Sequence, residues 1–199
     1  MKRAVASLVL AGLLVACGGD DGGELTGLTR DPEPQVDTVA LPDVSTGGEP
    51  FELRAPTDGL LVVYFGYTNC PDVCPTTLAD LKSALEELGD EADRVEVAMV
   101  TVDPERDTPV LAEYVQSFVP GAHALATDDP AALQSAAEPF GVSYQVTTGP
   151  DGEIDVGHSS YLFAVDETGK LVITWPVGVD ENSASAEDLA ADMRQLLAA

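Results

Sequence analysis

The pattern of apolar and polar positions predicts strands and helices in alternation along most of the chain. The longest apolar run after the N-terminus, 59–67, is rich in β-branched and aromatic residues, which is typical of a strand buried on both faces. Leucines then recur at helical spacing from 78 to 88, and Gly89 can end that helix. Two cysteines between these segments therefore lie where a central strand meets a helix.

The alternation continues through the rest of the chain. A second apolar run, 94–102, predicts another core strand. Thr108 and Pro109 suit the N-cap and first position of a helix that ends at 118. The later pattern predicts a short strand at 123–127, a helix at 130–140, antiparallel strands at 160–165 and 170–175, and a helix at 186–197. We therefore predict an α/β, thioredoxin-like fold: a central mixed β-sheet flanked by helices, with a C-terminal β-hairpin and helix.

The N-terminus predicts export from the cytoplasm. Residues 1–16 place two cations before an apolar run that is too short to span a bilayer comfortably, which is typical of a signal peptide. The sequence LVACG at 14–18 resembles the lipobox of bacterial lipoproteins, whose cysteine is acylated and becomes the new N-terminus. This resemblance implies a lipid anchor on Cys17 at the extracytoplasmic face of the cell membrane. A secreted protein cut elsewhere is the alternative.

Composition predicts one domain behind a tether. Residues 17–40 are rich in Gly, Asp and Pro, which predicts a flexible chain, and 41–199 is long enough for a single domain with its own core. The formal net charge of −26, from 35 acidic and 9 basic residues, would repel a polyanion. Nucleic acid is therefore excluded as a partner, whereas the oligomeric state stays open.

Cys70 and Cys74 lie in the stretch GYTNCPDVCPTT, 66–77. A disulfide that closes so short a loop would add little stability, so a functional role explains the pair better. At a helix N-terminus the thiolate is favoured, and a thiolate is both a nucleophile and a metal ligand. The residues alone leave a redox couple and a metal site open.

Three blocks in order resemble the SCO/SenC family: GYTNCPDVCPTTL at 66–78, VTVDPERDTP at 100–109 and GHSSYLFAVDETGKL at 157–171. Members of that family are thioredoxin-like copper chaperones that help to assemble cytochrome c oxidase. The resemblance implies that Cys70, Cys74 and His158 bind a copper ion and that the copper-bearing subunit of the oxidase is the partner. Thiolate and imidazole suit copper chemically. The expected function is copper delivery from a redox-gated site.

Besides the three expected ligands, the residues Asp72, Asp103 and His123 could contribute to a metal site by their chemistry. Asp72, between the cysteines, and Asp103, in the second block, are candidates for a position beside the metal, although each also suits a helix start or a turn. His158 is expected in the loop before the strand at 160–165. We assign His123, which lies outside the three blocks, a structural or surface role.

Other functions compete with the chaperone. A thiol–disulfide oxidoreductase would use Cys70 as nucleophile and Cys74 as resolving thiol, but its usual motif has two residues between the cysteines, and it does not need His158. A peroxidase is suggested by Thr68, two positions before Cys70, but the sequence lacks a nearby basic residue to activate the thiolate. A lipoprotein with an incidental disulfide is the third alternative. The protein is therefore expected to be a chaperone rather than an enzyme.

Overall fold

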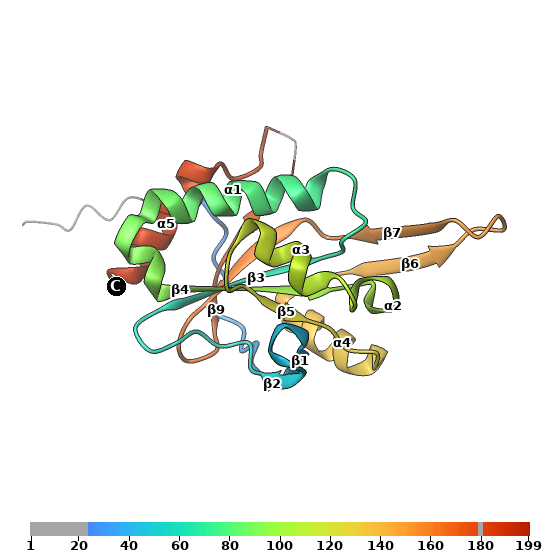
Figure 1. Cartoon of the computed structure of the whole chain (residues 1–199). Coiled ribbons are helices and arrows are strands. Elements are labelled where there is room, and N and C mark those ends of the chain that lie inside the picture. The colour runs from blue at the N-terminus through green and yellow to red at the C-terminus, as the bar shows by residue number, and fades with distance from the viewer. Residues whose placement is uncertain (1–23, 179–180) are drawn as a thin grey trace, which may run out of the picture.

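The computed structural model describes residues 24–178 and 181–199, which form one seven-stranded mixed sheet, a separate two-stranded sheet and flanking helices (Figure 1). The predicted central mixed sheet flanked by helices is confirmed. In spatial order the large sheet comprises β2 (Glu49–Phe51), β1 (Leu41–Asp43), β5 (His123–Leu125), β4 (Val95–Thr101), β3 (Leu60–Gly66), β8 (Tyr161–Val165) and β9 (Leu171–Pro176).

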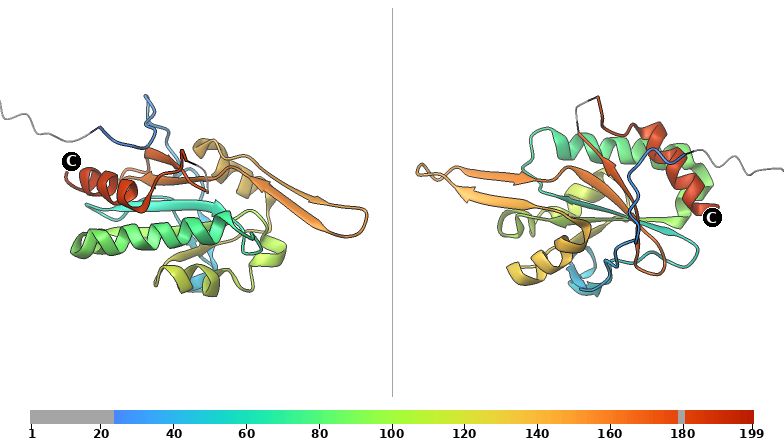
Figure 2. Two further views of the ribbon diagram at one scale, coloured as in Figure 1. Left: turned by 90° about the horizontal axis from the view of Figure 1, so that it is seen from above. Right: turned by 180° about the vertical axis from the view of Figure 1, so that it is seen from behind.

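Helices cover both faces of this sheet, as the two views in Figure 2 show. One face packs against α1 (Val73–Leu88), α3 (Leu111–Phe118) and α5 (Ala186–Leu197). The other face packs against α4 (Pro130–Ala137) and the 3₁₀ segment η3 (Glu138–Phe140), which together occupy the predicted helix 130–140. The shorter segments are α2 (Pro104–Asp107), η1 (Val44–Thr46) and η2 (Gly89–Arg94).

Strand β3 is the centre of the core, and every one of its residues is buried. It pairs in parallel with β4 and antiparallel with β8, so neither edge is exposed. Alternate side chains enter the two halves of the core: Val62 and Tyr64 on the α1 side, Val63 and Phe65 on the α4 side. Burial on both faces explains the unbroken apolar run and fixes the end of β3, from which the cysteine-bearing loop starts.

The predicted helix start at Thr108 is wrong. Pro104 begins a separate one-turn helix, α2, and Thr108 follows its last residue in helical conformation. The Thr108 hydroxyl donates a hydrogen bond back to the carbonyl oxygen of Pro104 at 2.7 Å, so it is not available to cap α3. Val110 occupies the N-cap of α3 instead.

Two hairpins were not predicted from the sequence. Strands β1 and β2 form one at the edge of the large sheet. Strands β6 (Tyr144–Thr148) and β7 (Ile154–His158) form the separate two-stranded sheet, which extends away from the body of the domain (Figure 1). The strand at 160–165 and its partner at 170–175 are confirmed as β8 and β9.

The described part of the predicted tether, 24–40, packs on the domain. Thr26 and Gly27 donate backbone hydrogen bonds of 3.0 Å to the buried carboxylate of Asp192 on α5, and Val36 is completely buried. These fixed partners differ from the flexible chain expected there. The signal peptide and Cys17 lie outside the described residues. Within the described residues, no helix has the length and apolar character needed to cross a membrane.

Candidate metal centre

The loop between β3 and α1 carries both cysteines. Cys70 precedes the helix, and Cys74 is the second residue of α1 and is completely buried. Both are free thiols. The backbone N–H of Cys74 donates a hydrogen bond to the sulfur of Cys70, 3.3 Å away. This N–H belongs to the first turn of α1, whose N–H groups have no acceptor within the helix. The fold therefore brings the two sulfurs to one point.

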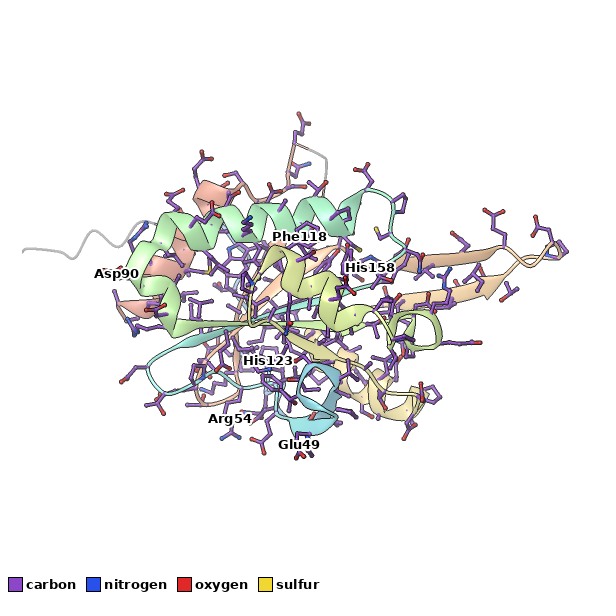
Figure 3. The ribbon with its side chains drawn as sticks, viewed as in Figure 1. Glu49, Arg54, Asp90, Phe118, His123 and His158 are labelled. Carbon is purple, nitrogen blue, oxygen red and sulfur yellow. The ribbon has the colours of Figure 1, made fainter. Side chains whose placement is uncertain are left out.

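His158 completes the group from a distant part of the chain. It is the last residue of β7, rather than part of a loop as the sequence indicated, and its Nε2 lies 3.7 Å from the sulfur of Cys74. The possible ligand atoms of Cys70, Cys74 and His158 all lie within 4.8 Å of one another. Figure 3 places His158 at the end of the domain from which the β6–β7 hairpin extends. The three predicted ligands are thus assembled in one place.

The histidine is oriented for ligation. Its Nδ1 lies 2.9 Å from the carbonyl oxygen of Ser159, an acceptor that requires the proton to be on Nδ1. The Nε2 lone pair is thereby directed toward the sulfurs, the arrangement that metal-binding histidines usually show. Tyr67 and Tyr64 contact the imidazole edge-on, with ring centroids 5.7 and 6.2 Å away. The imidazole is therefore packed between two aromatic side chains and the sulfur of Cys74.

The two thiols differ in acidity. Burial opposes ionisation of Cys70, but hydrogen bonds from the backbone and side chain of Cys74 outweigh it, and the pKa of Cys70 is lowered. Burial raises the pKa of Cys74 to about 12. Burial also lowers the pKa of His158, which keeps the imidazole neutral and able to bind a metal. A soft cation would therefore meet one thiolate-prone sulfur and one neutral nitrogen, and would displace the proton of Cys74.

The two acidic candidates do not join this group. Asp72 is exposed and lines the cavity of about 260 Å³ that also contains Cys70 and His158, and its side chain makes no capping hydrogen bond. Its backbone N–H, by contrast, contributes to lowering the pKa of Cys70. Asp103 is buried and forms an ion pair with Arg106. Neither carboxylate is among the potential ligands that the described residues bring together.

Asp107, which no sequence pattern singled out, is completely buried. Its carboxylate accepts hydrogen bonds from the backbone N–H of Thr68 at 2.9 Å, from the Thr68 hydroxyl at 2.5 Å and from the Thr101 hydroxyl at 2.6 Å. It therefore ties the cysteine loop to the end of β4. The only signal in the sequence was its place in the block VTVDPERDTP, where the family resemblance pointed to Asp103 instead.

Known proteins with this architecture include copper-bound forms. The solution structures of apo Sco1 from Thermus thermophilus are 36% identical, with a TM-score of 0.72 over 87% of this chain and 97% of that one. The structure of Bradyrhizobium japonicum ScoI with copper bound is 28% identical, with a TM-score of 0.64 over 79% of this chain and 96% of that one. The predicted thioredoxin-like α/β fold matches these structures.

The sequence comparisons agree. An SCO2-like protein of Rickettsia typhi is 32% identical over 132 residues, which are 65% of this chain and 64% of that relative's length. The chain thus spans somewhat less than two thirds of this relative. The profile of the SCO1/SenC family matches residues 43–198, which include both cysteines, His158 and the strands that position them. The chain therefore belongs to the SCO1/SenC family.

Proposed function

We propose that this protein binds one copper ion through Cys70, Cys74 and His158 and delivers it to the copper-bearing subunit of cytochrome c oxidase. The observation that supports the proposal most strongly is the convergence of two sulfurs and one imidazole nitrogen within 4.8 Å. This donor set suits copper in either of its common oxidation states. With only three protein ligands, a further position is open to a ligand of the recipient, which allows exchange.

Oxidation of the two thiols would gate the site. A disulfide needs a sulfur–sulfur bond of about 2.05 Å and removes both sulfur ligands, so its formation would release the metal. The two electrons would pass to an oxidant of the extracytoplasmic compartment, and reduction would restore the site. We also propose that acylated Cys17 anchors the protein to the extracytoplasmic face of the cell membrane.

Copper binding is tested on a chain that begins at residue 24, because Thr26 and Gly27 contact Asp192 in the folded domain. The reduced protein is loaded with copper without oxygen, and copper per chain is measured after desalting. We expect one copper in the parent and none in the double variant Cys70→Ser, Cys74→Ser. Stoichiometric copper in the double variant would rule out the site.

Delivery is tested by mixing the loaded protein with the copper-free oxidase subunit in detergent and separating the two. Copper that moves to the subunit faster than to an equal concentration of a small-molecule chelator supports direct transfer. Transfer at the rate of copper loss to solvent contradicts it.

A thiol–disulfide reductase is the second candidate. It is favoured by the asymmetry of the thiols, since Cys70 is partly exposed with a lowered pKa, whereas Cys74 is buried. This is the arrangement of a nucleophile and a resolving thiol. The variant His158→Ala separates the two functions, because it should weaken copper binding and leave dithiol exchange intact. A parent that binds no copper and reduces a test disulfide would favour the reductase.

A further inference from the structure

The β6–β7 hairpin extends from the domain next to the proposed copper site. Both views in Figure 2 show it as a projection with no other element along its outer part. Strands β6 and β7 pair only with each other among the described strands. An isolated two-stranded hairpin is marginally stable in water, and its unpaired edges are templates for another strand. The hairpin is therefore a two-stranded sheet whose outer edges are free to pair with another strand, and it carries a proposed metal ligand, His158.

The hydrogen-bond pattern shows which backbone groups β7 leaves free. At one end of the ladder the N–H of Ser159 donates to the carbonyl of Ser143 at 3.0 Å, and at the other the N–H of Gly149 donates to the carbonyl of Glu153 at 2.7 Å. Hydrogen-bonded pairs alternate with non-bonded pairs in an antiparallel ladder. With this register, the backbone groups of the alternate residues point away from β6; these are Ile154, Val156 and His158.

This free edge runs into the metal site. The cavity of about 260 Å³ that contains Cys70 is lined by Val156, Gly157 and His158 from β7 and by no residue of β6. On the same face of the hairpin, Val146 lies opposite Val156 and is 42% exposed, whereas Val156 is buried. A strand added along β7 would therefore lie beside the half-buried side chain of Ile154, and its end would reach the cavity that contains Cys70.

Charge indicates the kind of strand that fits. Between residues 143 and 160 the charged side chains are Asp151, Glu153 and Asp155, with no Lys or Arg. A second copy of this chain would set the same carboxylates against each other, and like charges across paired strands are destabilising. A basic segment would be attracted instead, both by the hairpin and by the net charge of −26.

We propose that the free edge of β7 is the docking site for an extended, basic segment of the copper recipient, which pairs with Ile154, Val156 and His158 through main-chain hydrogen bonds. The proposal rests on the proposed function, since it names the surface used in copper delivery. Pairing of this kind gives affinity through the backbone and places the side chains of the added strand in register with the site. The recipient's own ligands would thereby reach the metal beside His158.

Two proline variants test which edge is used. Ile154→Pro removes an outward N–H of β7, and Thr148→Pro removes the outward N–H of its cross-strand partner on the opposite edge, so neither breaks the ladder. Binding of the copper-loaded protein to the copper-bearing oxidase subunit in detergent is measured for both. We expect at least about tenfold weaker binding for Ile154→Pro and binding close to the parent for Thr148→Pro. Equal binding by the two variants, or greater loss in Thr148→Pro, overturns the proposal.

A charge reversal tests the basic character of the partner without a backbone change. Glu153→Lys should weaken binding severalfold and reduce its dependence on salt. Asp90→Lys is the matched control, because Asp90 is exposed and lies at the other end of the domain from His158 (Figure 3). Equal effects of the two reversals would show that only the overall charge matters and would overturn the docking site.

Copper per chain, measured on every variant, separates this proposal from the proposed function. One copper per chain with unaltered binding in Ile154→Pro refutes only the docking edge. A parent that binds no copper refutes both. Sedimentation of the protein alone is the last control: a dimer that Ile154→Pro converts to a monomer would show that a second copy occupies β7, contrary to the proposal.

Discussion

The two histidines of this chain lie in contrasting surroundings. His123, in β5, has its Nδ1 2.7 Å from the buried carboxylate of Asp43 and its Nε2 3.9 Å from the exposed carboxylate of Glu96. Its ring packs on Phe51 with centroids 4.2 Å apart. Both ring nitrogens therefore face carboxylates, and the side chain joins β1, β2 and β5. These contacts support a structural role for His123, which the sequence left as structural or surface.

His158 differs in the partner of each nitrogen. Its Nδ1 is held by a backbone carbonyl, that of Ser159, and its Nε2 faces the sulfur of Cys74. The lone pair of Nε2 thus remains available to a metal and points toward the cysteine sulfurs. Burial and residue type do not distinguish the two histidines; the groups that face their nitrogens do, and these groups make His158 the candidate metal ligand.

The largest expected effect is on copper. His158→Ala should lower copper affinity by at least about 100-fold, because loss of a ligand exceeds the effect of losing a group that orients one. His123→Ala should leave affinity within about twofold of the parent, since its nitrogens face Asp43 and Glu96 rather than the sulfurs. Competition with a chelator of known affinity measures both. Similar losses in the two variants would remove the distinction between the histidines.

The second largest effect is expected from a buried carboxylate, that of Asp107, which supports the cysteine loop. Asp107→Asn should lower copper affinity by about 10–100-fold, because the cysteine loop loses an acceptor for Thr68. The matched control is Asp192→Asn, which alters an equally buried carboxylate that holds Thr26 and Trp175. That control should reduce stability and leave copper affinity unchanged. Unaltered affinity in Asp107→Asn would show that the loop does not need this support.

A third, smaller effect is on stability. His123→Ala should reduce the free energy of unfolding by about 1–3 kcal/mol, since it leaves the buried carboxylate of Asp43 without one of its partners. His123→Gln, which keeps a side-chain N–H, should lose less. Urea unfolding of the copper-free proteins measures the difference. A His123→Ala variant as stable as the parent would contradict a structural role for this residue.

The smallest effect is a dependence on pH. Burial lowers the pKa of His158 in the folded protein, so as the pH falls through 6.5 the unfolded chain takes up a proton that the folded chain does not. Stability of the copper-free protein should therefore fall below pH 6.5 and level off below the folded pKa, by less than about 1.4 kcal/mol per pH unit. His158→Gln should lose this component of the pH dependence. Identical pH profiles in parent and variant would argue against the buried, neutral imidazole.

The sequence predicted the parts of the fold that burial dictates. The run 59–67 reads as a central strand because all of β3 is enclosed, and the leucines from 78 to 88 predict α1 because one face of that helix is buried. The β6–β7 hairpin could not be predicted in this way, since four of the five residues of β6 are exposed and its pattern lacks a buried face. Its role in positioning His158 emerged only from the structure.

For the site, the sequence predicted the three proposed ligands but not the residues that support them. The resemblance of three blocks brought Cys70, Cys74 and His158 together, and the structure assembles them; their roles as ligands stay a prediction. Asp107 escaped notice because its partner Thr68 lies 39 positions away, and no periodicity links residues across such a separation. Asp72 lowers the pKa of Cys70 through its backbone N–H. Every residue type except proline provides such a group, so the identity of this residue could not signal the effect.

X-ray absorption at the copper edge of the anaerobically loaded protein tests the central claim most directly. We predict two sulfur neighbours and one imidazole nitrogen in the parent, and the loss of that nitrogen in His158→Ala. A copper ion surrounded by nitrogen and oxygen alone, or an imidazole that persists in His158→Ala, would contradict binding at Cys70, Cys74 and His158.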